Sequence, residues 1–264
     1  MKYENVIFDW NGTLIDDVLC GVETINESLK KRGLPEIDRE KYLRVFRFPV
    51  IEYYKTLGFD FSAESFEEVA KEYVKNYLER EPKTELFPEA KEVLAVLKSK
   101  KAKLFILSAS EKSSLLAALE KREATKYFDG IYALDDIYAA SKVELGKRLL
   151  GTLSDPKNCL MVGDTEHDYE VAKELGFDCV LCPRGHAARE KLEATGAPII
   201  ENLYGVIPLV FPQKTGSAKR VLPTNPGSNE RRSFDLAEAE PRDFRTKYKD
   251  FYDDVKNTNK TEDW

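Results

Sequence analysis

The chain has 264 residues, 42% of them hydrophobic and 33% charged, so we expect one or two globular domains over most of its length rather than a fibrous or disordered protein. Lys and Arg number 41 against 47 Asp and Glu, a formal charge of -6 without the basic excess typical of nucleic-acid-binding proteins. We see neither the apolar region of a signal peptide nor a run of about 18 apolar residues, and therefore expect a cytoplasmic protein that binds neither nucleic acid nor a membrane.

Five short apolar runs have the composition of strands that are buried on both faces, as in a parallel sheet. They lie at 5–8, 103–107, 130–133, 159–162 and 179–182. Segments with helical spacing, at 111–121, 141–150 and 166–175, alternate with the later runs. This alternation predicts an α/β fold with a doubly wound parallel sheet, that is, a Rossmann-like core.

A long helical span separates the first two apolar runs. Its expected helices lie at 17–33, 39–57, 63–80 and 87–99, with glycine and proline between them. One helix would be enough to connect two parallel strands. We therefore predict that 17–86 is an inserted helical cap domain over the carboxyl edge of the sheet, and that 1–16 and 87–212 form the core.

The last part of the chain differs in composition from the rest. Only seven Val, Leu, Ile or Phe residues fall within 213–264, and Pro, Gly, Ser and Asn cluster at 223–229. A folded core needs a larger aliphatic fraction. We predict a mostly disordered C-terminal tail with a short helix around 242–255, and the tail is a candidate for binding another protein.

The cysteines do not form a recognisable metal or disulfide framework. Cys179 and Cys182 have C-x-x-C spacing, but they lie in an apolar run that is typical of a buried strand. The chain has only two histidines and no second cysteine pair. A zinc site would therefore lack ligands, and we interpret the cysteines as packed thiols.

Acidic and amide side chains follow the first apolar run directly. Asp9 is placed at the carboxyl end of the predicted strand, where open α/β sheets bind ligands. Residues two apart in an extended chain face the same way, so Asn11 is expected to point where Asp9 points. On its own, this string also fits a turn in which Gly12 adopts a positive φ angle.

Two further carboxylates follow the fourth apolar run, at Asp164 and Asp168. Helix capping alone is an alternative explanation for both, because Asp is favoured at the start of a helix. It leaves their expected position beside Asp9 unexplained. Three converging acids repel one another unless a cation lies among them, and oxygen ligands of this kind suit Mg²⁺.

Two more polar residues occupy comparable positions. Ser108 follows the second apolar run, and its hydroxyl could bind phosphate oxygens at the start of the next helix. Lys142 precedes the helix before the fourth run and could neutralise the acids. Taken singly, a serine there is more often a helix cap and a lysine is more often solvated. Their order along the chain favours a phosphoryl-transfer site.

These residues resemble the four motifs of the haloacid dehalogenase superfamily of Mg²⁺-dependent phosphatases, most of all its phosphoglycolate-phosphatase-like branch. The matching residues, in order, are Asp9, Asn11, Gly12 and Thr13, then Ser108, then Lys142, then Asp164 and Asp168. The resemblance covers about 1–212 and does not extend to 213–264.

The resemblance implies a role for each motif residue. Asp9 would be the nucleophile that forms an aspartyl-phosphate. Mg²⁺ would be held by Asp9, the backbone carbonyl of Asn11 and Asp164, with Asp168 supporting it through water or Lys142. The phosphoryl oxygens would be bound by Ser108, Lys142, Thr13 and the N–H groups of Gly12 and Ala109.

The resemblance also sets expectations for the substrate, a small phosphorylated metabolite. Arg47, in the predicted cap, could reach its far end, because a guanidinium suits a carboxylate or a second phosphate. A solvated arginine is the alternative. The protein is expected to be a monomer or a homodimer.

One position departs from the phosphatase pattern. Most of these phosphatases have a second aspartate where this chain has Asn11, and that aspartate protonates the leaving alcohol. Losing a general acid typically costs about 10²–10⁴ in rate. Three alternatives follow: a phosphonoacetaldehyde hydrolase, which needs a cap lysine such as Lys41 or Lys55; a metal-free dehalogenase; or a catalytically weak binding or scaffold protein.

Overall fold

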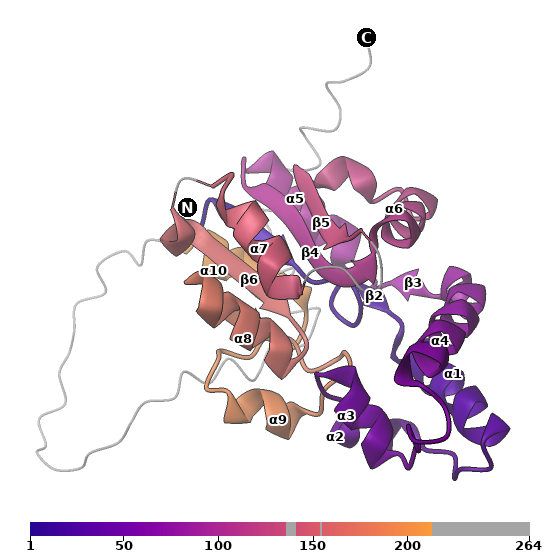
Figure 1. Ribbon diagram of the computed structural model, residues 1–264. Coiled ribbons are helices and arrows are strands. Elements are labelled where there is room, and N and C mark those ends of the chain that lie inside the picture. Colours follow the sequence, from indigo (N-terminus) through magenta and orange to yellow (C-terminus); the bar gives the residue numbers. More distant parts are fainter. Residues whose placement is uncertain (136–140, 154, 213–264) are drawn as a thin grey trace, which may run out of the picture.

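A five-stranded sheet forms the centre of the molecule (Figure 1). The computed structural model describes residues 1–135, 141–153 and 155–212. The strands, in sheet order, are β5 (Gly130–Leu134), β4 (Lys103–Glu111), β1 (Asn5–Phe8), β6 (Cys159–Gly163) and β7 (Asp178–Leu181). Each pairing in this sheet is parallel. The predicted doubly wound α/β sheet is confirmed.

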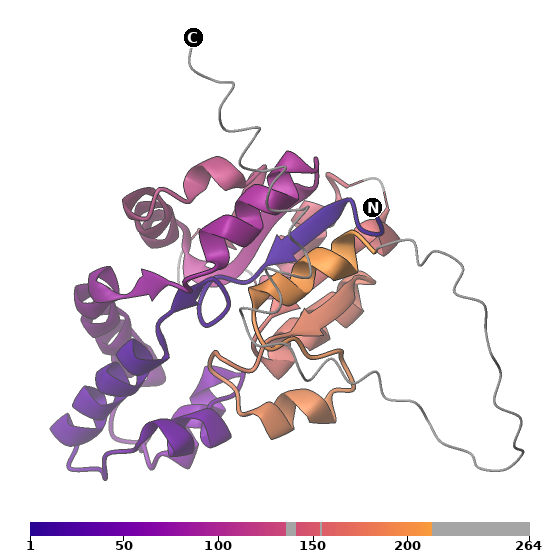
Figure 2. The same cartoon turned by 180° about the vertical axis from the view of Figure 1, so that it is seen from behind.

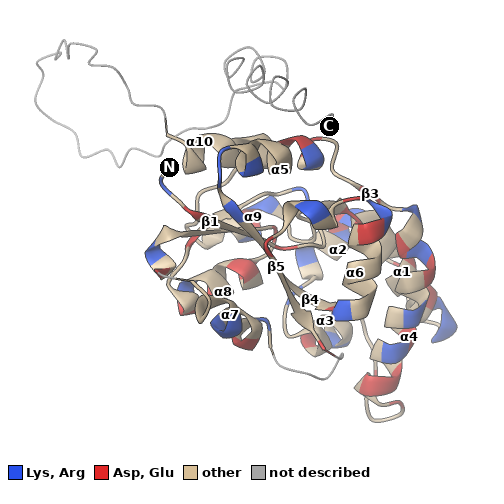
Figure 3. Cartoon of the chain, turned by 90° about the horizontal axis from the view of Figure 1, so that it is seen from above, with Lys and Arg blue, Asp and Glu red and all other residues tan. Residues whose placement is uncertain are grey.

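Helices cover both faces of the sheet, because alternate side chains of each strand point to opposite faces. Val6 and Phe8 of β1 pack into one hydrophobic cluster with α5, α6 and α10, and Ile7 packs into another with α7 and α8. Figures 2 and 3 show α5 and α10 on one side of the sheet, opposite α7 and α8. The helices are α5 (Ala90–Ser99), α6 (Lys112–Lys121), α7 (Lys142–Leu150), α8 (Glu166–Leu175), α9 (Arg189–Ala194) and α10 (Val206–Val210), with short 3-10 helices η2 (Thr125–Tyr127), η3 (Pro156–Asn158) and η4 (Leu203–Gly205).

A helical segment is inserted between two short antiparallel strands, β2 (Ile15–Asp16) and β3 (Glu85–Leu86). Its elements are α1 (Val18–Lys31), α2 (Arg39–Val45), α3 (Val50–Thr56), α4 (Phe66–Arg80) and η1 (Glu81–Lys83). These helices have a hydrophobic cluster of their own, rich in tyrosine and phenylalanine. They occupy the segment predicted as the cap, and Figure 1 shows them gathered beyond β2 and β3, outside the sheet.

Two elements differ from the sequence prediction. The single helix expected at 39–57 is two helices, α2 and α3, separated by Phe46–Pro49. Pro49 lacks an N–H group and disfavours helical backbone at Phe48, so the chain starts a new helix after the proline. Strand β4 continues past its predicted end to Glu111, and its register with β5 shifts between Leu107 and Glu111.

The surface of the described part carries both signs of charge, with Lys and Arg interspersed among Asp and Glu over the helices (Figure 3). None of the described helices combines the length and the apolar composition needed to cross a membrane. The predicted tail, 213–264, with its helix around 242–255, lies outside the described residues.

A buried ion pair connects the end of the helical insertion to α6. The Nη1 atom of Arg122 lies 2.8 Å from Oε1 of Glu81, and both side chains are at most about a tenth exposed. The Nη2 atom of Arg122 also donates to the carbonyl oxygens of Glu81 and Thr84, at 3.0 and 2.9 Å.

We expect Arg122→Met to lower the free energy of unfolding by about 3 kcal/mol, because the Glu81 carboxylate would stay buried without its partner. Adding Glu81→Gln should recover part of the loss. Lys147→Met, which breaks an exposed pair with Glu144, should cost at most about 0.5 kcal/mol. Urea denaturation measures all three, and equal effects of the two single substitutions would contradict the interpretation.

Candidate functional site

The strand ends bring the predicted polar residues together at one edge of the sheet. Asp9 follows β1, Asp164 follows β6, and Lys142 is the first residue of α7. Asp168 lies in the first turn of α8. All four side chains are buried, with Asp164 fully inaccessible. Parallel strands with their carboxyl ends at one edge account for this convergence.

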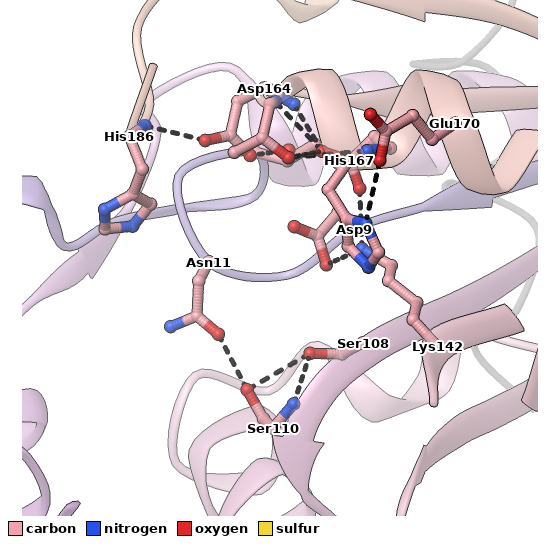
Figure 4. Close-up of polar contacts among 12 residues, drawn as sticks. Asp9, Asn11, Ser108, Ser110, Lys142, Asp164, His167, Glu170 and His186 are labelled. Carbon is pink, nitrogen blue, oxygen red and sulfur yellow. Dashed lines mark hydrogen bonds and ion pairs between the residues drawn. The ribbon is translucent and has the colours of Figure 1, made fainter. Parts of the chain in front are cut away.

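Lys142 lies between two carboxylates, and Figure 4 labels one of them, Asp9. Its Nζ atom is 2.7 Å from Oδ1 of Asp9 and 2.6 Å from Oδ1 of Asp168. Burial disfavours the ammonium, but Asp168 and Asp9 more than compensate and raise the pKa of Lys142. Burial likewise opposes ionisation of Asp168, yet Lys142 keeps its pKa below the ordinary value. Lys142 is therefore a fixed positive charge at the site.

Asp168 also organises the start of α8. Its Oδ2 atom accepts hydrogen bonds from the backbone N–H groups of Asp164 and Thr165 and from the Thr165 hydroxyl, at 3.1, 3.0 and 2.8 Å. The capping role considered as an alternative is thus present together with the ion pair to Lys142. Both oxygens of Asp168 are engaged within the protein.

Asp9, Asp164 and Asp168 form a cluster that fits a divalent cation. One oxygen of each lies within 4.8 Å of those of the other two. Burial raises the pKa of Asp9 to about 6 and that of Asp164 to about 8, and the neighbouring acids add to both shifts. A cation among the three oxygens would remove this cost of ionisation, and carboxylate oxygen is the ligand that Mg²⁺ prefers.

Small residues let the backbone approach Asp164 closely. Gly12 has a φ angle of 69°, and a Cβ atom there would lie 2.3 Å from Oδ2 of Asp164. A Cβ atom at Gly185 would lie 2.0 Å from the same oxygen. That oxygen accepts a hydrogen bond from the backbone N–H of His186 at 2.7 Å. Larger side chains at Gly12 or Gly185 would displace the carboxylate.

The amide of Asn11 is held on both sides. Its Nδ2 group donates to Oδ2 of Asp17 and to the Tyr77 hydroxyl, each at 2.8 Å. Its Oδ1 atom accepts a hydrogen bond from the Ser110 hydroxyl at 2.7 Å (Figure 4). Asn11 is therefore oriented by the helical insertion and by β4 together, and its amide is not acidic enough to protonate a leaving group.

Asp17 forms a second buried ion pair, with His186. Nε2 of His186 lies 3.1 Å from Oδ1 of Asp17, and Nδ1 lies 2.8 Å from the Tyr42 hydroxyl. Burial opposes both charges, but the pairing lowers the pKa of Asp17 and raises that of His186 to about 9. The pair connects β2 and α2 to the loop after β7.

The other predicted phosphate-binding residues are close to the site. The N–H group of Gly12 donates to Oδ1 of Asp17 at 2.8 Å, and the Thr13 hydroxyl donates to Asp164 at 2.7 Å. The Ser108 hydroxyl lies 3.1 Å from that of Ser110. Ser108 and Ala109 line the cavity beside Asp9. Ser108 lies within β4 rather than after it.

Arg47 lies away from this cluster. It is exposed, its guanidinium donates to the Thr56 hydroxyl at 2.9 Å, and it is not among the residues that line the cavity. The same is true of the candidate cap lysines, since Lys41 and Lys55 are exposed and do not line it. The structure therefore does not bring these three side chains to Asp9.

A cavity of about 530 Å³ opens beside Asp9, between the sheet edge and the helical insertion. Asp9, Asn11, Ser108 and Lys142 line one end of it. Side chains of α2, α3 and α4 line much of the rest. A smaller hollow, of about 300 Å³ beside Arg122, contains none of the site residues. The large cavity is where a substrate can reach Asp9.

Sequence analysis did not identify Asp17, His186, Ser110 or Tyr77 as site residues. A signal was available for His186, which follows the last predicted strand in a loop that also contains Gly185. Asp17 and Tyr77 lie in a segment that the sequence analysis interpreted only as helical. They are 60 positions apart, so no local sequence motif indicates that they meet. Their roles depend on how the insertion meets the core.

Comparison with known proteins gives consistent matches. The family model for haloacid dehalogenase-like hydrolases matches residues 6–182. A phosphoglycolate phosphatase from Aquifex aeolicus is 30% identical over 188 residues, covering 69% of this chain and 85% of that protein. A 5'-nucleotidase from Pseudomonas aeruginosa is 28% identical over 204 residues, covering 74% of this chain and 89% of that protein. A solved haloacid dehalogenase-like hydrolase from Streptococcus pneumoniae has a TM-score of 0.69 at 23% identity, covering 79% of this chain and 98% of that one, a likeness in fold.

Without divalent cations, we expect the protein to lose stability as pH rises from about 5 to about 8. Asp164 has a folded pKa of about 8 against an ordinary value of 3.8, so over this interval the folded state holds a proton that the unfolded chain releases. The raised pKa of His186 acts in the same direction above its ordinary value of 6.5. Mg²⁺ should therefore raise Tm more at about pH 8 than at about pH 5.

Asp164→Asn should remove most of the Mg²⁺-dependent rise in Tm. The control is Asp16→Asn, at an exposed acid outside the buried cluster, which should leave the rise intact. Thermal unfolding with Mg²⁺ and with a chelator measures the effect. An unchanged response in Asp164→Asn would show that the cation binds elsewhere.

Proposed function

The chain belongs to the haloacid dehalogenase-like hydrolase family, and from this premise we propose that it is a Mg²⁺-dependent phosphomonoesterase that acts on a small phosphorylated metabolite through an aspartyl-phosphate. The observation that carries the proposal is Asp9, a strand-end carboxylate that lines the cavity and lies 2.7 Å from the Lys142 ammonium. The names of the phosphatase relatives support it.

The reaction proceeds in two displacements. A carboxylate oxygen of Asp9 forms a bond to phosphorus, the ester P–O bond breaks, and its electron pair leaves on the alcohol oxygen. Water then attacks phosphorus, which releases inorganic phosphate and restores the Asp9 carboxylate. Lys142 balances the charge of the transferring phosphoryl group, and the Ser108 hydroxyl is placed to bind one of its oxygens.

Asp9, Asp164 and the backbone carbonyl of Asn11 would hold Mg²⁺, with Asp168 acting mainly through Lys142. When bound, the cation supplies positive charge that stabilises the phosphoryl oxygens in the transition state. Asp168 orients Lys142 at 2.6 Å and thereby keeps the ammonium beside Asp9. This supporting role follows from the engagement of both Asp168 oxygens within the protein.

The alternatives receive less support. A phosphonoacetaldehyde hydrolase would need a lysine facing the cavity, and among the described lining residues the one lysine is Lys142, which is paired with Asp9 and Asp168. A metal-free dehalogenase would have no need for the buried carboxylate of Asp164, whose ionisation a cation would favour. A purely binding protein would have no physical need for a buried cluster of four charges.

We also propose that the segment 17–86 acts as a cap that closes over the site, and that the enzyme works in the cytoplasm on a free metabolite, as a monomer or homodimer. Contacts between the insertion and the core support the first point, for example the Tyr42 hydroxyl on His186. All four cysteines are free thiols, which is typical of a reducing compartment. The tail remains a candidate for binding another protein.

Asp9→Asn should reduce Mg²⁺-dependent phosphate release by at least about a thousandfold, because the amide is a poor nucleophile and no other described side chain occupies its position. Asp16→Asn should retain activity. Phosphate release and circular dichroism together measure the result. Activity above about a hundredth of wild type in the folded Asp9→Asn protein would exclude Asp9 as the nucleophile.

Asn11→Asp should speed hydrolysis of alkyl phosphates more than that of aryl phosphates, whose leaving groups depart without a proton. The new carboxylate would face Asp17, and this repulsion raises the pKa of one of the two so that a proton is retained for the leaving alcohol. We expect the ratio of alkyl to aryl kcat/KM to rise at least about tenfold.

Asn11→Ala, which adds no acid, is the control and should leave the alkyl-to-aryl ratio unchanged. Steady-state kinetics with one ester of each class gives the ratio. An equal fall for both classes in Asn11→Asp would indicate that the carboxylate disturbs the cation instead of protonating the leaving group.

A further inference from the structure

We propose that the substrate is the monophosphate of a small uncharged aromatic alcohol, with the phosphate-bearing oxygen attached directly to the ring. This inference rests on the phosphatase function proposed above and names the class of leaving group. Three features of the described residues carry it: the rings that line the cavity, the charges around it, and the fixed amide of Asn11.

Aromatic side chains dominate the part of the cavity away from Asp9. The volume of about 530 Å³ falls in the range of drug-sized ligands and exceeds what a two-carbon ester needs. Aromatic residues from each of α2, α3 and α4, or from the loops beside them, line it, among them Phe46, Phe48, Tyr53, Tyr73 and Tyr77. Such walls favour a flat ring, which can stack or meet them edge to face.

The charges around the cavity disfavour an anionic leaving group. Lys142 is the one Lys or Arg among its described lining residues, and its ammonium is taken by Asp9 and Asp168. His186 is paired with Asp17, with Nε2 3.1 Å from Oδ1. Glu67, which pairs with Lys71 at 2.7 Å, and Glu111, which caps α6, also line the cavity. A glycolate carboxylate would therefore meet acidic side chains and, among the described lining residues, no Lys or Arg apart from the paired Lys142, whereas an uncharged ring needs no such partner.

Asn11 restricts the leaving group in a second, independent way. Its Nδ2 group is directed to Asp17 and Tyr77, and no carboxylic acid occupies its position. An alkoxide is a poor leaving group without a proton, because alcohols have pKa values close to that of water, about 15.7. A ring hydroxyl has a pKa near 10, like that of tyrosine, and can leave as the anion.

The first displacement therefore needs no acid from the protein. An Asp9 oxygen bonds to phosphorus, the P–O bond to the ring oxygen breaks, and the electron pair stays on the aryloxide. The aryloxide then takes its proton from solvent water. The second displacement restores Asp9 and releases inorganic phosphate, as for any ester.

The test compares four phosphate esters with Mg²⁺: phenyl phosphate, phosphoglycolate, a nucleoside 5′-monophosphate and an unbranched alkyl phosphate. We expect phenyl phosphate to have the highest kcat/KM, by at least about tenfold. Because aryl esters are also intrinsically reactive, binding is measured separately by calorimetry with phenylphosphonate and carboxymethylphosphonate, whose P–C bonds this reaction does not break. Phenylphosphonate should bind at least about tenfold more tightly.

Two matched pairs of variants test whether the residues that line the cavity cause the preference for an aromatic ligand. Phe46 lines the cavity and Phe61 does not, and both are half-buried in the same cluster of the insertion. Phe46→Ala should weaken phenylphosphonate binding about tenfold, and Phe61→Ala should leave it within about twofold of wild type. Equal effects of the two would overturn the role of the aromatic wall.

The second pair tests the charge argument. Leu78 on α4 is 40% exposed and lines the cavity, whereas Leu116 on α6 is 38% exposed and does not. Leu78→Arg should raise kcat/KM for phosphoglycolate relative to phenyl phosphate at least about fivefold. Leu116→Arg should leave the ratio unchanged. If the wild-type enzyme has a higher kcat/KM for any of the three alkyl esters than for phenyl phosphate, this inference is overturned and the proposed phosphatase function is not. If the enzyme hydrolyses none of the four esters, both are overturned.

Discussion

The site depends on one buried ammonium. Lys142 lies 2.7 Å from Asp9 and 2.6 Å from Asp168 in a place where three carboxylates converge and water is largely excluded. Without this charge, the pKa of Asp9 would rise further, because burial and the neighbouring Asp168 already oppose its ionisation and Lys142 lowers it. The parallel sheet makes the arrangement possible, because it brings residues from β1, β6, α7 and α8 to one edge.

A second buried pair, Asp17 with His186, sets the other side of the site. It joins the start of the helical insertion to the loop after β7, and the Tyr42 hydroxyl extends the contact to α2. Asp17 also orients Asn11. The same residues thus fix the position of the insertion and the orientation of the Asn11 amide. Most of the aromatic residues that line the cavity belong to that insertion, so the leaving-group chemistry and the leaving-group recognition that we propose have a common structural origin.

Much of the core could be predicted from the sequence because its signals are local. Buried parallel strands are continuous apolar runs, and a polar residue directly after such a run must lie at the carboxyl edge, as Asp9 and Asp164 do. Asp17 and His186 are 169 positions apart, and only the tertiary fold brings them together. The charge of Arg47 suited a substrate anion, but the sequence carries no information on which way the segment between α2 and α3 faces. The cavity could not be predicted from the sequence either, because tyrosines that line a cavity have the same spacing as tyrosines that fill a core.

The central claim is that Asp9 carries the phosphoryl group during turnover. The most direct measurement is to quench the enzyme during hydrolysis of phenyl phosphate, reduce it with borohydride and sequence its peptides by mass spectrometry. An aspartyl-phosphate is reduced to homoserine, so the account predicts homoserine at position 9 in samples quenched during turnover and none in samples without substrate. Turnover with unmodified aspartate at position 9 and a phosphoryl group on another side chain would contradict it.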